Sequence, residues 1–264
     1  MNFLRKRVAP TSGAGETRIL LSKPNRKSES YSARRLNGLA KRMRSAHRYL
    51  EVGVAQGLTL EQIRVSERWG VDPRPQFDSE CLPKGTHFHS QESDEFFKNL
   101  DSEIKFDLIF LDGLHTWQQT YTDLLNCLNH AHSRTIILID DVVPDDELAA
   151  FPDWSEALIM KSAAGIEDGR WQGDVFKVML AIRDLHPELD YCVVGQNTIS
   201  DNPQAILWVS NPSDRKYSNP DITQLESSYD PVTYSDVFID QQIPKYFNHL
   251  TEKNGIRMAT KAIS

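Results

Sequence analysis

The sequence predicts an α/β fold in which helices cover both faces of a doubly wound, mostly parallel sheet of seven strands. Short runs rich in branched aliphatic residues, at 107–111 and 135–139, are typical of parallel strands buried on both faces. Between them, residues 116–131 carry apolar side chains at helical spacing, as a crossover helix would. The last strand is expected to run antiparallel, because the loop before it is too short for a crossover helix.

The first part of the chain is expected to hold an arm, a helix and a strand. Residues 1–30 are rich in Pro, Gly, Ser and charge without a sustained period, which predicts a loosely ordered arm. Apolar residues recur on one helical face over 31–47, so we expect an amphipathic helix there. A strand that begins at Tyr49 runs into a glycine turn, and a helix is expected to follow to about Trp69.

The middle of the chain is expected to alternate between strands and helices. A second strand ends at Asp72, where Pro73 forces a loop. Residues 86–89 predict a third strand, and residues 93–100 predict a short helix that Ser93 would cap. The two buried strands described above come next and continue the alternation.

The C-terminal half is expected to close the sheet and then extend beyond it. Residues 174–185 have a helical pattern, and residues 189–194 and 205–209 predict the last two strands. Beyond them the chain turns polar, with a short helix expected within 234–250. The expected parts are a basic arm (1–30), a main domain (31–210) and a polar C-terminal extension (211–264).

The charge of the chain is unevenly distributed. The net charge is −7, yet the first 48 residues hold 13 of the 30 Lys and Arg residues and two of the 37 acidic ones. Such a basic arm could dock an anionic partner, or pack on the acidic body of its own or a second subunit, as in a homodimer. Its aromatic residues are too sparse for base stacking, so nucleic acid is not the expected partner.

Other features of the sequence indicate a cytoplasmic protein. No run approaches the length of a membrane span, and the start lacks the apolar stretch of a signal peptide. The three cysteines are odd in number and lack metal-binding spacing, which fits a reducing compartment.

Residues that suit an adenosine ligand lie at the ends of the first two strands. Gly53 permits a tight turn close to a ligand, and Gly57 lets the next helix pack against that turn. An acid at Asp72 suits the two hydroxyls of a ribose. Because Glu51 would repel a phosphate, and Ala55 replaces the middle glycine of a dinucleotide turn, a ligand with an ammonium group and no phosphate is favoured. S-adenosylmethionine is such a ligand.

The order Glu-x-Gly-x-x-x-Gly, Val-Asp-Pro and Phe-Asp-Leu-Ile-Phe-Leu-Asp resembles the class I S-adenosylmethionine-dependent methyltransferases, which have a Rossmann-like fold. The resemblance covers about residues 48–210. It implies that Glu51, Gly53 and Gly57 hold the methionine part of the cofactor and that Asp72 binds the ribose. It also implies that the loop after the third strand meets the adenine, near Gln91, Ser93 and Asp94.

A second constellation follows the two buried strands. Asp112 ends one strand, with His115 three residues later, and Asp140 and Asp141 end the other. Ligands of open α/β sheets bind at the carboxyl ends of the strands, and three carboxylates there favour a hard divalent cation such as Mg²⁺. A neutral imidazole beside them would act as a base. Taken singly, each residue also fits a turn, a solvated loop or a hydrogen-bonded core histidine.

These four residues are similar to the site of the metal-dependent O-methyltransferases of the catechol and macrolide-sugar type. The resemblance implies that Asp112, Asp140 and Asp141 bind Mg²⁺ or another hard divalent cation. It implies that Asp112 and His115 are catalytic, with His115 as general base. The Asp-Gly-Leu-His motif is most similar to that of enzymes that methylate a hydroxyl of a sugar or other small natural product.

Two other functions remain open at this point. One is a metal-independent N- or O-methyltransferase for small molecules, which keeps the cofactor and drops the cation. The other is a binding protein whose basic arm docks nucleic acid or an anionic surface. A further open question concerns Trp171, which suits either the wall of an acceptor site or the anchor of a loop.

Overall fold

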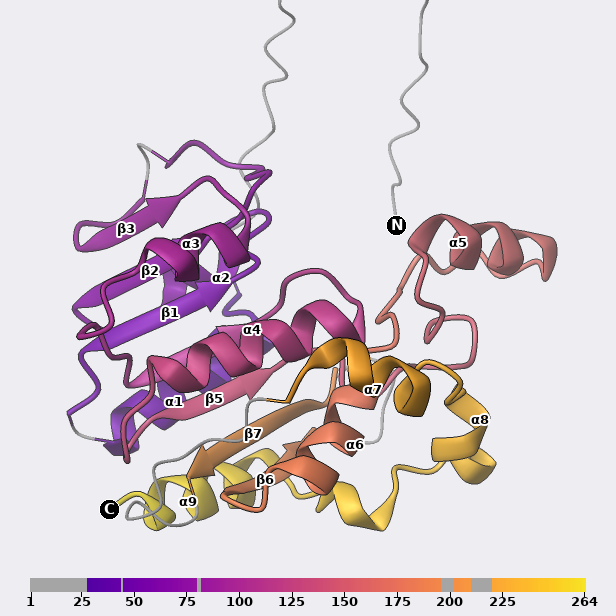
Figure 1. Ribbon diagram of the computed structural model, residues 1–264. Helices are drawn as coiled ribbons and strands as arrows, with labels where there is room; N and C mark the ends of the chain where they lie inside the picture. Colours follow the sequence, from indigo (N-terminus) through magenta and orange to yellow (C-terminus); the bar gives the residue numbers. More distant parts are fainter. Residues whose placement is uncertain (1–27, 44, 80–81, 196–201, 210–219) are drawn as a thin grey trace, which may run out of the picture.

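The computed structural model describes residues 28–43, 45–79, 82–195, 202–209 and 220–264. Its strands are β1 (Arg48–Val52), β2 (Glu67–Val71), β3 (Thr86–His89), β4 (Leu108–Leu111), β5 (Ile136–Ile139), β6 (Leu189–Val194) and β7 (Gln204–Val209). They form one sheet in the order β3-β2-β1-β4-β5-β7-β6, in which β7 alone runs antiparallel to its neighbours (Figure 1). The predicted seven-stranded, mostly parallel α/β sheet is confirmed. Nearly all of the expected arm, residues 1–27, lies outside the described residues.

The register of the central strands determines where their ends meet. Val52 of β1 pairs with Leu111 of β4, and Leu111 pairs with Ile139 of β5. All residues of β4 and β5 are buried, as expected for parallel strands covered on both faces. The residues that follow these three strands therefore lie at one edge of the sheet.

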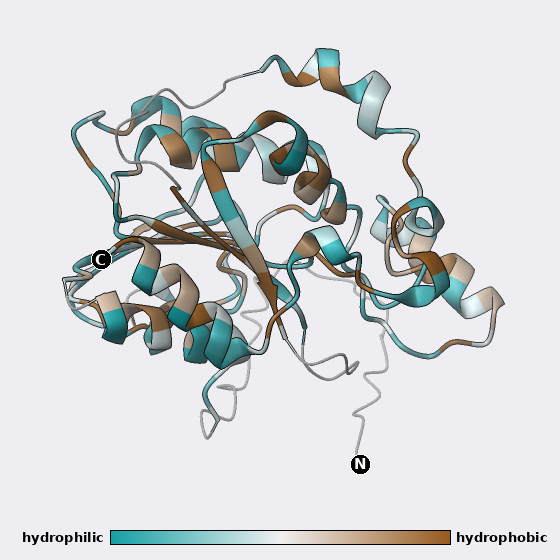
Figure 2. Ribbon diagram, turned by 90° about the horizontal axis from the view of Figure 1, so that it is seen from below, coloured by the Kyte–Doolittle hydropathy of each residue, from teal (hydrophilic) through white to brown (hydrophobic). Residues whose placement is uncertain are grey.

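Helices cover both faces of the sheet. They are α1 (Tyr31–Met43), α2 (Leu58–Gln62), α3 (Ser93–Asn99), α4 (Trp117–Asn129), α5 (Trp154–Ala163), α6 (Phe176–Leu185), α7 (Ile222–Tyr229), α8 (Tyr234–Val237) and α9 (Glu252–Ala262). Side chains of α3, α4 and α6 pack into the core on one face, and those of α1, α2 and α9 into the core on the other. Figure 2 shows the brown, hydrophobic strands between helices that alternate between brown and teal. Helix α5 projects away from the sheet (Figure 1).

The helix expected to reach Trp69 is wrong in its extent, because α2 ends at Gln62 and Trp69 lies in β2. The helix stops at Ile63, whose backbone is extended. The buried Arg68 side chain donates to the carbonyl oxygens of Ile63 and Val65, at 3.0 and 3.1 Å. Carbonyls that would have accepted bonds within a longer helix are satisfied by this guanidinium instead.

Ser93 was expected to cap the helix that begins there, and this prediction is wrong. The capping position is Glu92, which makes no side-chain cap bond, and Ser93 is the first helical residue. Its hydroxyl instead accepts a hydrogen bond from Gln119 of α4 at 3.3 Å. The side chain thus connects two helices.

The single short helix expected within 234–250 is broken into smaller pieces. Helix α8 has four residues and is followed by two 3-10 turns, Ile239–Gln241 and Lys245–Phe247. Asp240 has a left-handed φ of 53°, which an α-helix does not accommodate. The regular helices of this region are α7 and α9, which the sequence reading missed.

Helix α9 packs directly on the sheet. A Cβ atom placed on Gly255 would lie 2.2 Å from Val194 Cγ1 of β6, so only glycine permits this approach. On its other side α9 meets α1, where Gly38 faces Ile256. The two ends of the described chain therefore meet behind β6 and β7. Among the described helices, none is long and apolar enough to cross a membrane.

Candidate functional site

The turn after β1 touches the end of β4 through the backbone. Gly53 has a left-handed φ of 83°, and a Cβ atom placed on it would lie 1.9 Å from the carbonyl oxygen of Asp112. Only glycine fits this position. The turn expected to hold the cofactor and the first expected cation ligand are therefore immediate neighbours.

Asp72 fixes the shape of that turn. Its Oδ2 accepts hydrogen bonds from the backbone N–H groups of Val54 and Ala55, at 2.9 and 2.7 Å. Its Oδ1 accepts from the N–H of Arg74 at 2.7 Å. An ionised carboxylate has about four acceptor sites, so one remains for a ribose hydroxyl. The sequence did not indicate that the same acid also holds the turn.

Glu51 differs from its expected electrostatic role. Its carboxyl is buried and accepts a hydrogen bond from the Tyr49 hydroxyl at 2.7 Å. Burial raises the pKa of Glu51 to about 8, although the bonds from Tyr49 and from the Leu60 backbone oppose the shift. Without a ligand, this carboxyl is therefore mostly neutral at pH 7. Glu51 would therefore repel a phosphate, as expected, only where a nearby cation keeps its carboxyl ionised.

The residues expected near the adenine lie at the start of α3. Gln91 is partly buried in the loop after β3, and Ser93 and Asp94 begin the helix. The Gln119 side-chain amide donates to Ser93 and Asp94, both at 3.3 Å, and also to the buried Asp123 at 3.3 Å. Sequence reasoning missed Gln119 and Asp123. Burial raises the pKa of Asp123 to about 7.

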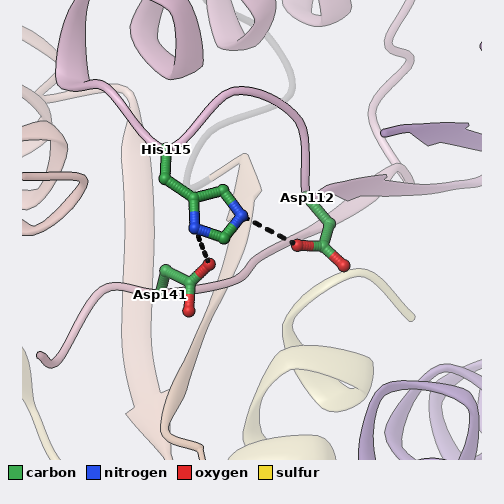
Figure 3. A group of neighbouring side chains, drawn as sticks. All are labelled: Asp112, His115 and Asp141. Atoms are coloured by element: carbon green, nitrogen blue, oxygen red, sulfur yellow. Dashed lines mark ion pairs between the residues drawn. The ribbon is translucent and has the colours of Figure 1, made fainter. Parts of the chain in front are cut away.

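Asp112, His115 and Asp141 form a cluster at the ends of β4 and β5 (Figure 3). The His115 Nδ1 lies 3.1 Å from Asp141 Oδ2, and its Nε2 lies 3.8 Å from Asp112 Oδ1. One ligand atom from each residue lies within 4.8 Å of the others, the spacing of a possible metal site. Asp140, the other expected ligand, is not part of this cluster.

His115 is held in one orientation. Its Nδ1 also lies 3.3 Å from the carbonyl oxygen of Trp171, which can only accept, so Nδ1 carries the proton. The neutral ring then has its free lone pair on Nε2. Burial lowers the pKa of His115, which keeps the ring neutral, although Asp140 and the Trp171 carbonyl oppose the shift.

Trp171 anchors a loop beside His115. The two rings stack with centroids 4.9 Å apart and an interplanar angle of 11°. The indole N–H donates to the carbonyl oxygen of Phe151 at 2.6 Å. Gly173 lies so close that a Cβ atom would be 1.8 Å from the His115 carbonyl oxygen. This glycine, with its φ of 63°, is a signal that could have linked the loop to His115.

Asp140 and Asp141 share the Asn202 side-chain amide as a donor, whereas only Asp141 belongs to the cluster with His115. Asp141 has a left-handed φ of 58°, which is uncommon for residues other than glycine, although aspartate adopts it more often than most. Asp140 Oδ1 accepts from the Asp141 N–H at 2.9 Å and from the Asn202 side-chain amide at 2.6 Å. The same amide donates to Asp141 at 3.2 Å. Sequence reasoning missed Asn202, which lies 61 positions beyond Asp141.

The three aspartates are crowded. Removal from water raises the pKa of Asp140 and of Asp141 to about 7. Removal from water also raises the pKa of Asp112, and repulsion from Asp140 and Asp141 raises it further. A divalent cation would reverse these shifts, because it stabilises the ionised carboxylates. The oxygen-rich donor set fits Mg²⁺ or another hard cation.

Comparison with known proteins agrees with this geometry. A family model described as a methyltransferase domain matches residues 39–142, from α1 to just past Asp141. The matched segment contains β1 to β5 and the ends of β4 and β5, where the aspartates lie. The predicted resemblance to the class I S-adenosylmethionine-dependent methyltransferases is thereby confirmed. No curated protein matches the chain.

Solved structures share this fold. A Klebsiella pneumoniae protein assigned as an O-methyltransferase is 17% identical, with a TM-score of 0.51, over 70% of this chain and 83% of its own. Cofactor-bound Rv0187 from MTB is 15% identical, with a TM-score of 0.51, over 73% and 82%. The O-methyltransferase TomG from Streptomyces achromogenes, which is involved in tomaymycin synthesis, is 13% identical, with a TM-score of 0.50, over 71% and 83%.

Proposed function

We propose that this methyltransferase transfers the methyl group of S-adenosylmethionine to a hydroxyl of a sugar or other small natural product, assisted by a divalent cation. One observation carries the proposal. An imidazole with its free lone pair on Nε2 lies between Asp112 and Asp141, beside the Gly53 turn. Cation-assisted O-methylation uses a base, oxygen ligands for the cation and a turn that binds the cofactor. Here these three features are neighbours.

The cofactor would bind at the turn after β1. The Gly53 and Gly57 positions leave the backbone open to a ligand, and Asp72 retains an acceptor site for a ribose hydroxyl. The ammonium group of the methionine part would favour ionisation of Glu51. TomG was solved in complex with S-adenosylmethionine, and its shared fold supports the same cofactor here.

The cation would bind where the aspartates crowd. Asp112 and Asp141 offer carboxylate oxygens within one cluster, and Asp140 lies next to them. When bound, Mg²⁺ would hold the substrate hydroxyl and lower its pKa. Asp141 would also keep the proton of His115 on Nδ1, since its Oδ2 lies 3.1 Å away.

His115 would be the general base. The free lone pair on Nε2 can take either a proton or a cation, and we assign it the proton because carboxylates already supply ligands. The hydroxyl oxygen attacks the methyl carbon as the carbon–sulfur bond breaks. The electron pair of that bond stays on sulfur as S-adenosylhomocysteine forms, and the hydroxyl proton goes to Nε2. Such proton transfer is typically worth about 10²–10⁴ in rate.

Chelation provides the test. A panel of hydroxylated sugars and phenols is assayed for S-adenosylhomocysteine formation by the full chain, before and after treatment with EDTA. We expect activity with at least one hydroxyl acceptor, its loss on chelation and its return with Mg²⁺. Activity that survives chelation would exclude the cation.

A metal-independent N- or O-methyltransferase is the second candidate. It is favoured by the Asp141–His115 pair, which orients a base without a cation. Chelation separates the two candidates, and an acceptor panel with amines separates nitrogen from oxygen. The binding-protein alternative depends on the arm, nearly all of which lies outside the described residues. A cytoplasmic location and a homodimer also stay predictions.

A further inference from the structure

A partly buried hydrogen-bond network connects both ends of the described chain to the Asp140–Asp141 pair. It consists of Arg35 on α1, Asn202 and Gln204 at the start of β7, and Glu252 at the start of α9. We call these four residues the Arg35 network. None of them was singled out by the sequence analysis, and the methyl-transfer mechanism above uses none of them.

Arg35 is the centre of this network. Its side chain is fully buried, so its charge requires partners in place of water. The Nη1 atom donates to the carbonyl oxygen of Asn202 at 2.7 Å and to the side-chain oxygen of Gln204 at 2.8 Å. The Nε atom donates to the Glu252 carboxylate at 3.2 Å. A buried arginine with these partners holds three segments in fixed relative positions.

Asn202 transmits this restraint to the aspartates. Its carbonyl oxygen is held by Arg35, while its side-chain amide donates to Asp140 at 2.6 Å and to Asp141 at 3.2 Å. Gln204, two residues later, also donates to Ser32 Oγ at 2.8 Å. Both the backbone and the side chain at this point are therefore fixed.

The other side of Asp141 faces the base. One carboxylate oxygen accepts from Asn202, and the other lies 3.1 Å from His115 Nδ1. The direction of the Asp141 carboxylate is thus restrained by Asn202, and together with the Trp171 carbonyl oxygen it keeps the proton of His115 on Nδ1.

We propose that Asn202 is a positioning residue for the Asp140–Asp141 pair and that Arg35 and Glu252 hold it in place. The inference rests on the proposed function in that it assigns His115 as the base. Without the Asn202 amide, the two carboxylates repel each other and lose their shared donor. Asp141 then turns away from Nδ1, and only the longer bond to the Trp171 carbonyl oxygen, at 3.3 Å, still favours the Nδ1–H tautomer. The share of the Nε2–H tautomer therefore rises.

Imidazole nitrogen spectra test this proposal without a cation or an acceptor. The full chain is labelled with ¹⁵N-histidine, and the His115 signals are assigned from their loss in His115→Gln. We expect the Nδ1–H tautomer in the unaltered protein and a mixture of tautomers in Asn202→Ala and Arg35→Gln. Unchanged His115 signals in Asn202→Ala would overturn the proposal. If Arg35→Gln does not fold, Asn202→Ala alone serves as the test.

Arg34→Gln is the matched control. Arg34 donates to the same Glu252 carboxylate at 3.0 and 2.6 Å, but its side chain is 43% exposed. We expect the Nδ1–H tautomer to persist in this variant, because the bonds of Arg35 to Asn202 remain. A mixture of tautomers in Arg34→Gln as well would show a general loosening of α1 against α9, and would contradict the specific role of Arg35.

Mn²⁺ titration separates this inference from the proposed function. Loss of residues that orient metal ligands typically weakens metal binding about 10–100-fold. We expect a weakening of about 10-fold in Asn202→Ala and Arg35→Gln, and less than about twofold in Arg34→Gln. If the unaltered protein binds no Mn²⁺, the cation in the proposed function fails, while the His115 spectra still decide the positioning role.

Discussion

The two halves of the proposed site, one for the cofactor and one for the reaction, are built in different ways. In the cofactor half, Asp72 binds the backbone of the Gly53 turn, within about twenty residues of chain. In the reaction half, His115 and Asp141 come from separate strand ends, and the Arg35 network behind them reaches Glu252. Local backbone contacts thus shape one half, and side chains far apart in sequence shape the other. If this contrast holds, each half can be damaged separately.

The largest effect is expected in the reaction half, from Asp141→Ala. This change removes a carboxylate from the cluster and the acceptor that orients His115. We expect methyl transfer to fall by about 10³-fold or more, since orientation and proton transfer both suffer. S-adenosylhomocysteine binding, measured by calorimetry, should remain within about twofold. Joint loss of binding and activity would show that the halves are not independent.

His115→Gln should affect the same half through the base alone. Proton transfer by a positioned base typically contributes about 10²–10⁴ in rate, and we expect a loss in that range. Cofactor and Mn²⁺ binding should both remain, because the carboxylates are intact. Loss of Mn²⁺ binding in this variant would identify His115 as a ligand and not the base.

Gly53→Ala should damage the cofactor half. The new Cβ atom would lie 1.9 Å from the Asp112 carbonyl oxygen, in a backbone conformation that alanine disfavours. We expect a loss of about 1–3 kcal/mol in the free energy of unfolding, together with weaker S-adenosylhomocysteine binding. Gly169→Ala is the control, because no atom lies within 4 Å of the added Cβ. Equal effects at both positions would refute the close approach of β1 and β4.

The smallest effect is a pH dependence of stability. The pKa values of Asp140 and Asp141 are about 7 in the folded protein, above the ordinary value near 4. The folded state therefore binds more protons between about pH 4 and 7, so the contribution of these groups to stability is lost as pH rises through 7. In EDTA, we expect a Tm that is lower at pH 8 than at pH 5.5.

Mg²⁺ and a matched variant sharpen this pH test. Because a cation stabilises the ionised carboxylates, added Mg²⁺ should raise the Tm more at pH 8 than at pH 5.5. The double variant Asp140→Asn with Asp141→Asn should reduce the pH dependence in EDTA. An equal pH dependence in this variant would assign it to other groups, among them Glu51, whose pKa is about 8.

Sequence reasoning succeeded where the signal was local. The buried aliphatic runs of β4 and β5 predicted two central strands, and the glycine turn after β1 led to the methyltransferase family. It failed where a single side chain or an unusual backbone conformation ended a helix. Arg68 ends α2 by binding two carbonyl oxygens, and the left-handed Asp240 interrupts the helix expected within 234–250.

By itself, the sequence determined the strands, their mostly parallel direction and the residue types at their ends, because hydrophobic period and glycine turns act over a few neighbouring residues. Only the tertiary structure decided that His115 faces Asp141 and that Asp140 turns to Asn202. It also brought Arg35 and Glu252 together behind them. Buried polar groups need hydrogen-bond partners, and these can come from any part of the chain that packs nearby. Such pairings therefore produce no regular spacing in the sequence from which they could be predicted.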